Sequence, residues 1–170
     1  MAGTVWSVPV QFAEVPDSGL HVELEAPEPT RAGIAELAGL RAVLELTASF
    51  NVTRRGAGLQ VQGEVKAQVE QTCVVTLEPV ENAVDEEVDL LFVPGAMPRA
   101  EGETDENLPE PLIDGRIDLG AIATEFLVLG IDPYPRKPGV AFEGPKPETN
   151  GTHPFAALAA LKKDQGRSQS

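Results

Sequence analysis

The chain lacks most of the residue types from which disulfide-stabilised, metal and catalytic sites are built. Its 170 residues include one cysteine, Cys73, and two histidines, His21 and His153. A single thiol excludes an internal disulfide and fits a reducing compartment. Neither histidine has helical or hairpin spacing to another metal ligand, so a histidine-rich metal site is not expected. We expect His21 on the solvent face of a strand and His153 at the start of a helix.

Long apolar runs are also missing. No stretch approaches the roughly 20 apolar residues that a membrane-spanning helix requires, and the N-terminal sequence MAGTVWSVPVQF has no basic region followed by an apolar run. The sequence contains neither a glycine-rich phosphate loop nor a serine nucleophile elbow. We therefore expect a cytoplasmic protein that does not enter a membrane, binds no cofactor and has no catalytic residues.

Positive charge is scarce, and negative charge is concentrated in the middle of the chain. The net charge is −14, from 13 basic and 27 acidic side chains. Between residues 78 and 118 the acidic side chains are opposed only by Arg99 and Arg116. Such a molecule repels phosphate polyanions at long range, so tight nonspecific nucleic-acid binding would need a segregated basic patch. Basic proteins are the easier partners.

Alternating apolar and polar residues predict a long antiparallel hairpin between residues 40 and 71. The apolar positions are Leu44, Leu46, Ala48, Phe50 and Val52 on the first strand, and Leu59, Val61, Val65, Ala67 and Val69 on the second. A period of two is typical of strands with one buried and one solvated face. Gly56 and Gly58 allow the chain to reverse between the strands.

Shorter elements surround this hairpin. Strands are predicted at residues 7–12, Leu20–Glu25 and 84–93, and Thr30 can cap a short helix with Ile34 and Leu37 on its apolar side. The sum is an α+β fold. We expect a twisted antiparallel sheet built on the long hairpin, with two or three helices packed on its apolar face.

The clearest helix is predicted over Leu119–Leu129. Asp118 can accept hydrogen bonds from the first-turn N–H groups, and Gly130 supplies a stop. Only Glu125 is charged within this run, so the helix must be covered on several sides. It is either a central core helix, which we favour, or a docking surface.

The domain organisation follows from composition. Residues 1–142 are predicted to form the α+β domain, with a mobile acidic loop at 94–111 that is too rich in proline, glycine and carboxylates to offset the entropy of ordering. Residues 143–152 have the composition of a linker, and residues 164–170 should form a disordered tail.

A C-terminal helix is predicted at residues 153–163, with Phe155 and Leu158 on its apolar stripe. Because a proline-rich linker precedes it, this stripe can dock either on the protein's own sheet or in a groove of a partner.

Three ordered blocks of the sequence resemble the YceD family of large ribosomal RNA subunit accumulation proteins. The blocks read CVVTLEPVENAVDEEVDLLFVP from Cys73, IDLGAIATEFLVLGIDPYPRKPG from Ile117 and HPFAALAALKK from His153. Many family members carry Cys-x-x-Cys in the first block, which suggests a metal clip. Here the matching positions end in Thr76, so the second thiol is absent and we do not carry a metal over to this chain.

The resemblance implies a non-enzymatic role in bacterial ribosome biogenesis that supports accumulation of the large-subunit (23S) ribosomal RNA. The net charge favours binding of a basic ribosomal protein or assembly factor, with ribosomal RNA touched only locally. The candidate partner or RNA contacts are Arg54, Arg55, Tyr134, Arg136, Lys137, Phe155 and Leu158.

Two other classes stay open. A metal-dependent hydrolase or nuclease would need acidic residues that converge on ordered elements. An acidic inhibitor that mimics nucleic acid would need regularly spaced carboxylates along one face. A structure is required to distinguish these alternatives.

Overall fold

A five-stranded sheet forms the centre of the structure, a computed structural model that describes residues 5–96 and 108–144. The elements in chain order are β1 (Pro9–Gln11), the 3-10 helix η1 (Phe12–Glu14), β2 (Leu20–Glu25), α1 (Glu28–Ala38), β3 (Ala42–Arg55), β4 (Gly58–Thr72), β5 (Pro79–Val93), β6 (Glu110–Pro111), β7 (Arg116–Asp118) and α2 (Leu119–Leu129). The chain divides into two compact units, Met1–Val140 and Ala141–Ser170. All of the helices and strands named above belong to the first unit.

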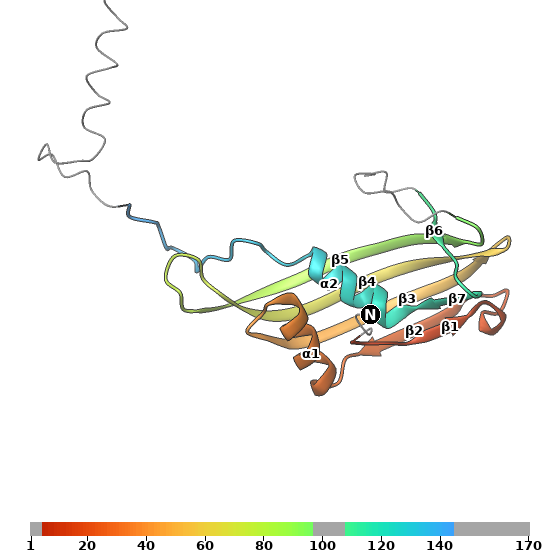
Figure 1. Cartoon of the computed structure of the whole chain (residues 1–170), viewed down its shortest axis with the longest axis horizontal. Coiled ribbons are helices and arrows are strands. Elements are labelled where there is room, and N and C mark those ends of the chain that lie inside the picture. The colour runs from red at the N-terminus through yellow and green to blue at the C-terminus, as the bar shows by residue number, and fades with distance from the viewer. Residues whose placement is uncertain (1–4, 97–107, 145–170) are drawn as a thin grey trace, which may run out of the picture. The chain divides into compact units, whose positions relative to one another are not determined.

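The strand order of the sheet is β2-β3-β4-β5-β6. All neighbours are antiparallel except β5 and β6. A separate antiparallel ribbon joins β1 to β7, and this ribbon and both helices lie against one face of the sheet (Figure 1). The α+β class and the long hairpin are therefore confirmed. The helix predicted at 153–163 lies outside the described residues.

The alternating pattern places one face of the long strands in the core, as predicted. Phe50, Val61 and Val65 are fully buried, whereas their sequence neighbours Asn51, Gln62 and Lys66 are exposed. Most of the driving force for this arrangement is the removal of apolar surface from water. The opposite face of the sheet, which we call the open face, consists mostly of polar and charged side chains, with Ala83 and Leu91 as apolar members.

The start of β3 departs from the predicted alternation. The pairing register shifts between Val43 and Glu45, so that Leu44 is an extra residue in the strand. Because side chains alternate between the two faces of a strand, one extra residue moves each preceding side chain to the opposite face. Val43 is therefore buried, while Leu44 is 44% exposed and does not belong to the core, contrary to the prediction.

Helix α2 has the bounds that the sequence predicts. The Asp118 carboxylate accepts the N–H groups of Gly120 and Ala121, each at 3.1 Å, and also that of Val8 at 2.8 Å. One side chain thus caps the helix and fixes the N-terminal segment beside it. Helix α2 buries Leu119, Ile122, Ala123 and Leu127, so core packing is confirmed for most of its length, but Leu129 is 70% exposed in the last turn.

Two expectations for α1 were wrong. The helix begins at Glu28 after Pro27, so Thr30 lies inside the first turn and does not cap it. Pro29 explains this start, because its fixed φ and missing N–H suit the first turn of a helix. Ile34 packs in the core as predicted, but Leu37 points outward and is 60% exposed.

The ends of the predicted acidic loop are described, although residues 97–107 are not. Glu110–Pro111 forms β6 and pairs in parallel with Phe92 and Val93 at the end of β5. Strand β5 itself starts at Pro79, five residues before the predicted start, and ends before Pro94 as expected. None of the helices in the described residues has the length and apolarity needed to cross a bilayer.

The bulge predicts unequal effects of two leucine truncations that the sequence pattern treats alike. Leu46→Ala should lower the free energy of unfolding by about 2–5 kcal/mol, because Leu46 is fully buried. Leu44→Ala should cost about 1 kcal/mol or less, because Leu44 is largely solvated. Urea denaturation followed by circular dichroism measures both, and equal losses would contradict the bulged register.

Candidate functional site

The turn between β4 and β5, residues 73–78, forms the first half of the candidate site. The Cys73 N–H donates to the Glu78 carbonyl oxygen at 2.8 Å, and the Leu77 N–H donates to the Cys73 carbonyl oxygen at 2.9 Å. Leu77 closes the turn with a φ of 61°, a left-handed conformation that is unusual for a leucine. Its side chain is 75% exposed. The turn therefore presents an apolar side chain to solvent from a tightly bonded backbone.

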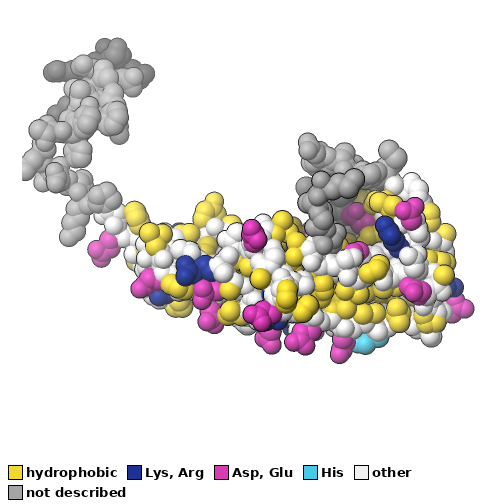
Figure 2. All heavy atoms as spheres, turned by 60° about the horizontal axis from the view of Figure 1, so that its bottom comes forward, with side chains coloured by type: hydrophobic (Ala, Val, Ile, Leu, Met, Phe, Trp, Pro, Cys, Tyr) yellow, Lys and Arg dark blue, Asp and Glu magenta, His cyan; other side chains and the backbone are white. Residues whose placement is uncertain are grey.

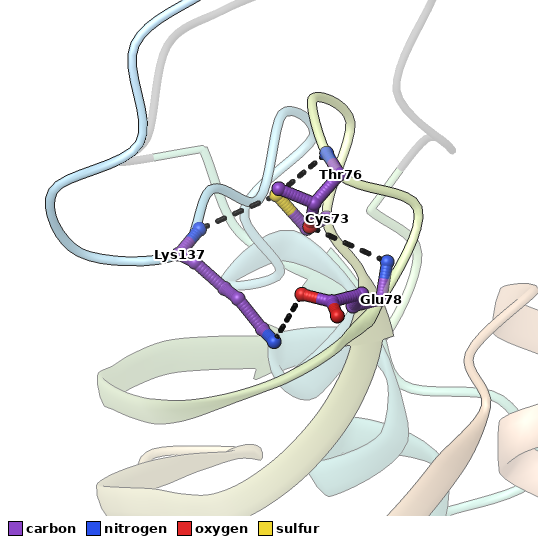
Figure 3. Close-up of polar contacts among 4 residues, drawn as sticks. All are labelled: Cys73, Thr76, Glu78 and Lys137. Carbon is purple, nitrogen blue, oxygen red and sulfur yellow. Dashed lines mark hydrogen bonds and ion pairs between the residues drawn. The ribbon is translucent and has the colours of Figure 1, made fainter.

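The second half is the proline segment, residues 132–140, which follows α2 and returns to the turn. The Pro135 carbonyl oxygen accepts the Val74 N–H at 2.9 Å. Lys137 Nζ pairs with a Glu78 carboxylate oxygen at 2.6 Å (Figure 3). The Gln71 side chain, which is buried, donates to the Asp132 carbonyl oxygen at 2.8 Å. These contacts bring the predicted site residues Tyr134, Arg136 and Lys137 beside Cys73.

The Cys73 thiol is the most perturbed titrating group of the site. It is fully buried, and Sγ accepts the N–H of Thr76 at 3.5 Å and the N–H of Lys137 at 3.4 Å (Figure 3). Hydrogen bonds from the Thr76 side chain and backbone, and then from the Lys137 backbone, lower the pKa of the thiol to about 6. These donors stabilise the thiolate because they point at the developing negative charge. The Lys137 side chain in turn lowers the pKa of Glu78.

These surroundings do not fit a metal clip, and no histidine of the described residues lies beside the thiol. In the described ranges, no three histidine, cysteine or acidic side chains are close enough to share a metal ion. The neighbours of Sγ are hydrogen-bond donors, whereas a metal needs further lone pairs. His21, which could act as a base, lies on the open face and hydrogen bonds to Asn51 at 2.9 Å. The buried Cys73 sulfur therefore acts as a hydrogen-bond acceptor that joins the turn to the proline segment.

The outer surface of the site combines apolar side chains with positive charge. Tyr134 is 70% exposed and Val74 is 46% exposed. The Tyr134 backbone is held by a hydrogen bond from its N–H to the Asp132 side chain at 2.9 Å. Arg136 is also exposed. An aromatic ring and a guanidinium group on a rigid loop can stack on a base and contact a phosphate, or can pack against a partner protein.

The two arginines at the hairpin tip lie elsewhere and differ from each other. Arg54 donates to the Phe12 carbonyl oxygen at 3.2 Å, its guanidinium stacks 4.8 Å above the Phe12 ring, and it pairs with Asp17 at 3.4 Å. These contacts use Arg54 to hold η1 against the sheet. Arg55 is exposed and donates to the Gln60 side chain at 2.8 Å. Phe155 and Leu158 lie outside the described residues.

Sequence reasoning missed how the thiol is surrounded. Lys137 is separated from Cys73 by the whole of β5, the acidic loop and α2, so its N–H donor has no local signature. The alternating pattern also does not show that the Gln71 amide is buried at the end of β4. This amide joins β4 to β5 and to the proline segment, because it accepts a hydrogen bond from the Asn82 side chain at 2.8 Å and donates to Asp132. The prolines of the segment after α2 were the available signal, since they predict an extended chain that can return to the sheet.

The thiol makes stability depend on pH in a defined window. The pKa of Cys73 is about 6 in the folded chain, below the value of about 8.5 for a free cysteine. The unfolded chain therefore binds more protons between these values, so the free energy of unfolding should rise with pH across the window and fall as pH drops through about 6. Denaturation at a series of pH values checks the slope, and Cys73→Ser should remove it.

Thr76→Val supplies the matched test of the cause. It should raise the pKa of Cys73, as followed by the ultraviolet absorbance of the thiolate, because the hydrogen bond from the Thr76 side chain, the largest cause of the low pKa, is lost. Thr72→Val, at the exposed end of β4, should leave this pKa unchanged. A wild-type thiol that titrates near 8.5 would refute the proposed environment.

Comparison with known proteins places this site in a family. Neither the curated proteins nor the solved structures provide a match to the chain. One family does match: its description reads Large ribosomal RNA subunit accumulation protein YceD, and the match covers residues 61–162. The matched part includes most of β4, all of β5 and α2, and both halves of the candidate site. Since this is more than half of the chain, the protein belongs to the YceD family of large ribosomal RNA subunit accumulation proteins.

Proposed function

We propose that this protein supports accumulation of large-subunit (23S) ribosomal RNA in the bacterial cytoplasm as a binding factor without catalytic activity. It binds a basic ribosomal protein or assembly factor through its acidic surface and contacts ribosomal RNA only locally. The family supports the role in ribosomal RNA accumulation. The charge of the open face supports the choice of a basic partner.

The open face of the sheet carries the argument for a basic partner. The side chains of this face include the carboxylates of Glu23, Glu25, Glu45, Glu64, Glu70, Glu81, Asp85, Glu87 and Asp89. Lys66 and Arg55 are the cations of the same strands on this face. Acidic side chains are not confined to this face: on the side of the molecule that Figure 2 shows they also recur, and basic ones occur at few places. Such a surface attracts cations and repels phosphates.

The arrangement of this acid is not optimised for the stability of the isolated chain. Glu64 lies directly opposite Glu87 on the neighbouring strand. Like charges in this position destabilise a sheet. Lys66 relieves part of the repulsion, because its Nζ pairs with Glu64 at 2.7 Å. A cationic partner would relieve more of it, and an open hollow of about 410 Å³ over Glu23, Glu25 and Glu64 offers room for such a side chain.

Local RNA contact is assigned to the candidate site. Arg136 has no ion-pair partner in the described part of the chain, whereas Lys137 is paired with Glu78. Tyr134 is exposed beside Arg136 and can stack on an unpaired base. Because one free guanidinium and one ring give little affinity against a net charge of −14, RNA binding is expected to be secondary to protein binding.

One feature favours a second candidate, an acidic mimic of nucleic acid. Asp85, Glu87 and Asp89 occupy alternate positions on the open face of β5, which places their Cα atoms about 6–7 Å apart. This is the regular spacing that a mimic requires. A mimic would bind a protein at its RNA site, so added ribosomal RNA should compete for the same partner.

Affinity purification tests the proposed function. The tagged protein should retain basic large-subunit ribosomal proteins or assembly factors after nuclease treatment of the lysate, because charge attraction to protein does not require RNA. Depletion of the protein should lower the amount of large-subunit ribosomal RNA relative to the small-subunit species. Loss of every partner together with the RNA would overturn the choice of a basic protein.

Charge reversal tests the RNA contact. Arg136→Glu should weaken RNA association and lower the slope of log affinity against log salt by about 1, as expected for one lost phosphate contact. Arg116→Glu is the matched control, since it reverses an exposed arginine on β7 that is not among the candidate RNA contacts. Equal salt-dependent binding curves for wild type and Arg136→Glu would remove this residue from the site. Lys137 is not substituted, because a glutamate at position 137 would place a like charge beside Glu78, which is the ion-pair partner of Lys137.

A further inference from the structure

The outer edge of β5 is a long strand edge that the described chain leaves unpaired. On one side β5 pairs with β4 along its whole length, from Pro79 to Phe92. On the other side β6 pairs with it only at Phe92 and Val93 (Figure 1). No other described strand reaches residues 79–91. This edge extends for roughly 40 Å at about 3.3 Å per residue.

The backbone geometry identifies which groups face outward. The Val93 carbonyl oxygen accepts the Leu112 N–H at 2.9 Å, so it points away from β4. The register between β4 and β5 has no bulge, and residues of one parity in an antiparallel strand therefore point their N–H and C=O groups to the same side. Asp85, Glu87 and Asp89 share the parity of Val93. Their backbone groups are thus directed to the free edge.

The side chains along this edge are strongly acidic on the open face and mostly apolar on the other, where Asn82 and Glu86 are the polar members. On the open face the edge carries the carboxylates of Asp85, Glu87 and Asp89. Glu87 has no hydrogen bond or ion pair with the described residues, whereas Asp89 accepts from Gln60 and Gln62, each at 3.0 Å. On the core side Leu90 and Phe92 are half-buried and pack against the core.

We infer that the outer edge of β5 takes an extended cationic segment of a partner protein as an additional strand. This inference rests on the proposed function, because it specifies how the basic partner is held. Backbone hydrogen bonds to the free edge provide the affinity, and alternate lysine or arginine side chains of the added strand lie over Asp85, Glu87 and Asp89. Its other side chains are apolar and extend the contact with Leu90.

Charge explains why a cationic strand is preferred to a second copy of this chain. Exposed strand edges are usually shortened, bulged or charged, which prevents edge-to-edge pairing. The β5 edge is neither short nor bulged. Its acidic side chains are therefore the feature that can prevent edge-to-edge pairing. Two copies paired through this edge would bring like carboxylates together. The same carboxylates attract a basic segment, so one feature excludes self-association and selects the partner.

Synthetic peptides provide the probe. The first is an eight-residue peptide in which lysine and valine alternate, and its control has the same sequence with N-methyl groups on every second amide. We expect the unmodified peptide to bind measurably by fluorescence anisotropy and the N-methylated peptide to bind roughly tenfold more weakly, because it retains the charge but loses the edge hydrogen bonds. Equal binding of the two peptides would overturn strand addition.

Two substitutions at one position separate backbone pairing from charge. Glu87→Pro removes an outward N–H, which an edge strand tolerates, and obstructs an added strand. Glu87→Gln removes the same charge but keeps the N–H. We expect binding of the lysine–valine peptide to fall roughly tenfold for the proline variant and about two- to threefold for the glutamine variant. Equal losses would mean that the edge contributes charge alone, contrary to the inference.

Hydrogen exchange of the wild-type protein gives a readout that does not depend on the folding of a variant. The amides of Asp85, Glu87 and Asp89 should exchange more slowly with the lysine–valine peptide bound, and unchanged rates would refute strand addition. The proposed function and the strand addition at the β5 edge can be refuted independently. A Glu87→Pro protein that retains all basic partners from a lysate refutes the edge but not the proposed function, whereas a wild-type protein that retains none refutes the function.

Discussion

One-sided burial of the β3–β4–β5 meander is the constraint on which the rest of the structure depends. Alternate apolar side chains from the three strands form a single core with both helices and the β1–β7 ribbon. Because all of these elements cover the same face, the other face stays in contact with water and can carry dense charge. The stability of the fold and the availability of the acidic surface therefore have one cause.

The candidate site is a consequence of how the chain closes this core. Helix α2 must lie along the buried face, and Gly130 ends it against Val84 and Glu86 of β5. The proline segment then has few N–H groups of its own to satisfy and accepts or donates to the turn instead. The buried Cys73 sulfur and a buried glutamine amide join the two segments. The rigidity of the exposed Tyr134 and Arg136 derives from these polar contacts.

The distribution of charge separates two kinds of recognition in one molecule. The open face and the β5 edge are acidic, whereas the exposed arginine of the candidate site lies beside an aromatic ring. Opposite charge accelerates and orients encounter with a basic protein, and the same field keeps the RNA backbone away from most of the surface. The proposed binding of a basic protein, with only local contact to ribosomal RNA, rests on this field.

Local sequence determined the elements whose signals lie within a few residues. The alternation of β3 and β4 predicted their buried face, and Asp118 with Gly130 predicted the bounds of α2, because strand periodicity and helix capping are local effects. Only the tertiary structure decided the features that depend on contacts between residues distant in sequence. Arg54 binds Phe12 and Asp17 and so is not free at the hairpin tip. The bulge opposite β4 turns Leu44 outward. The Lys137 N–H donates to the sulfur of Cys73. The edge of β5 that the described residues leave unpaired belongs to the same class, since an edge is defined by the strands that do not pair with it, and pairing depends on the whole chain.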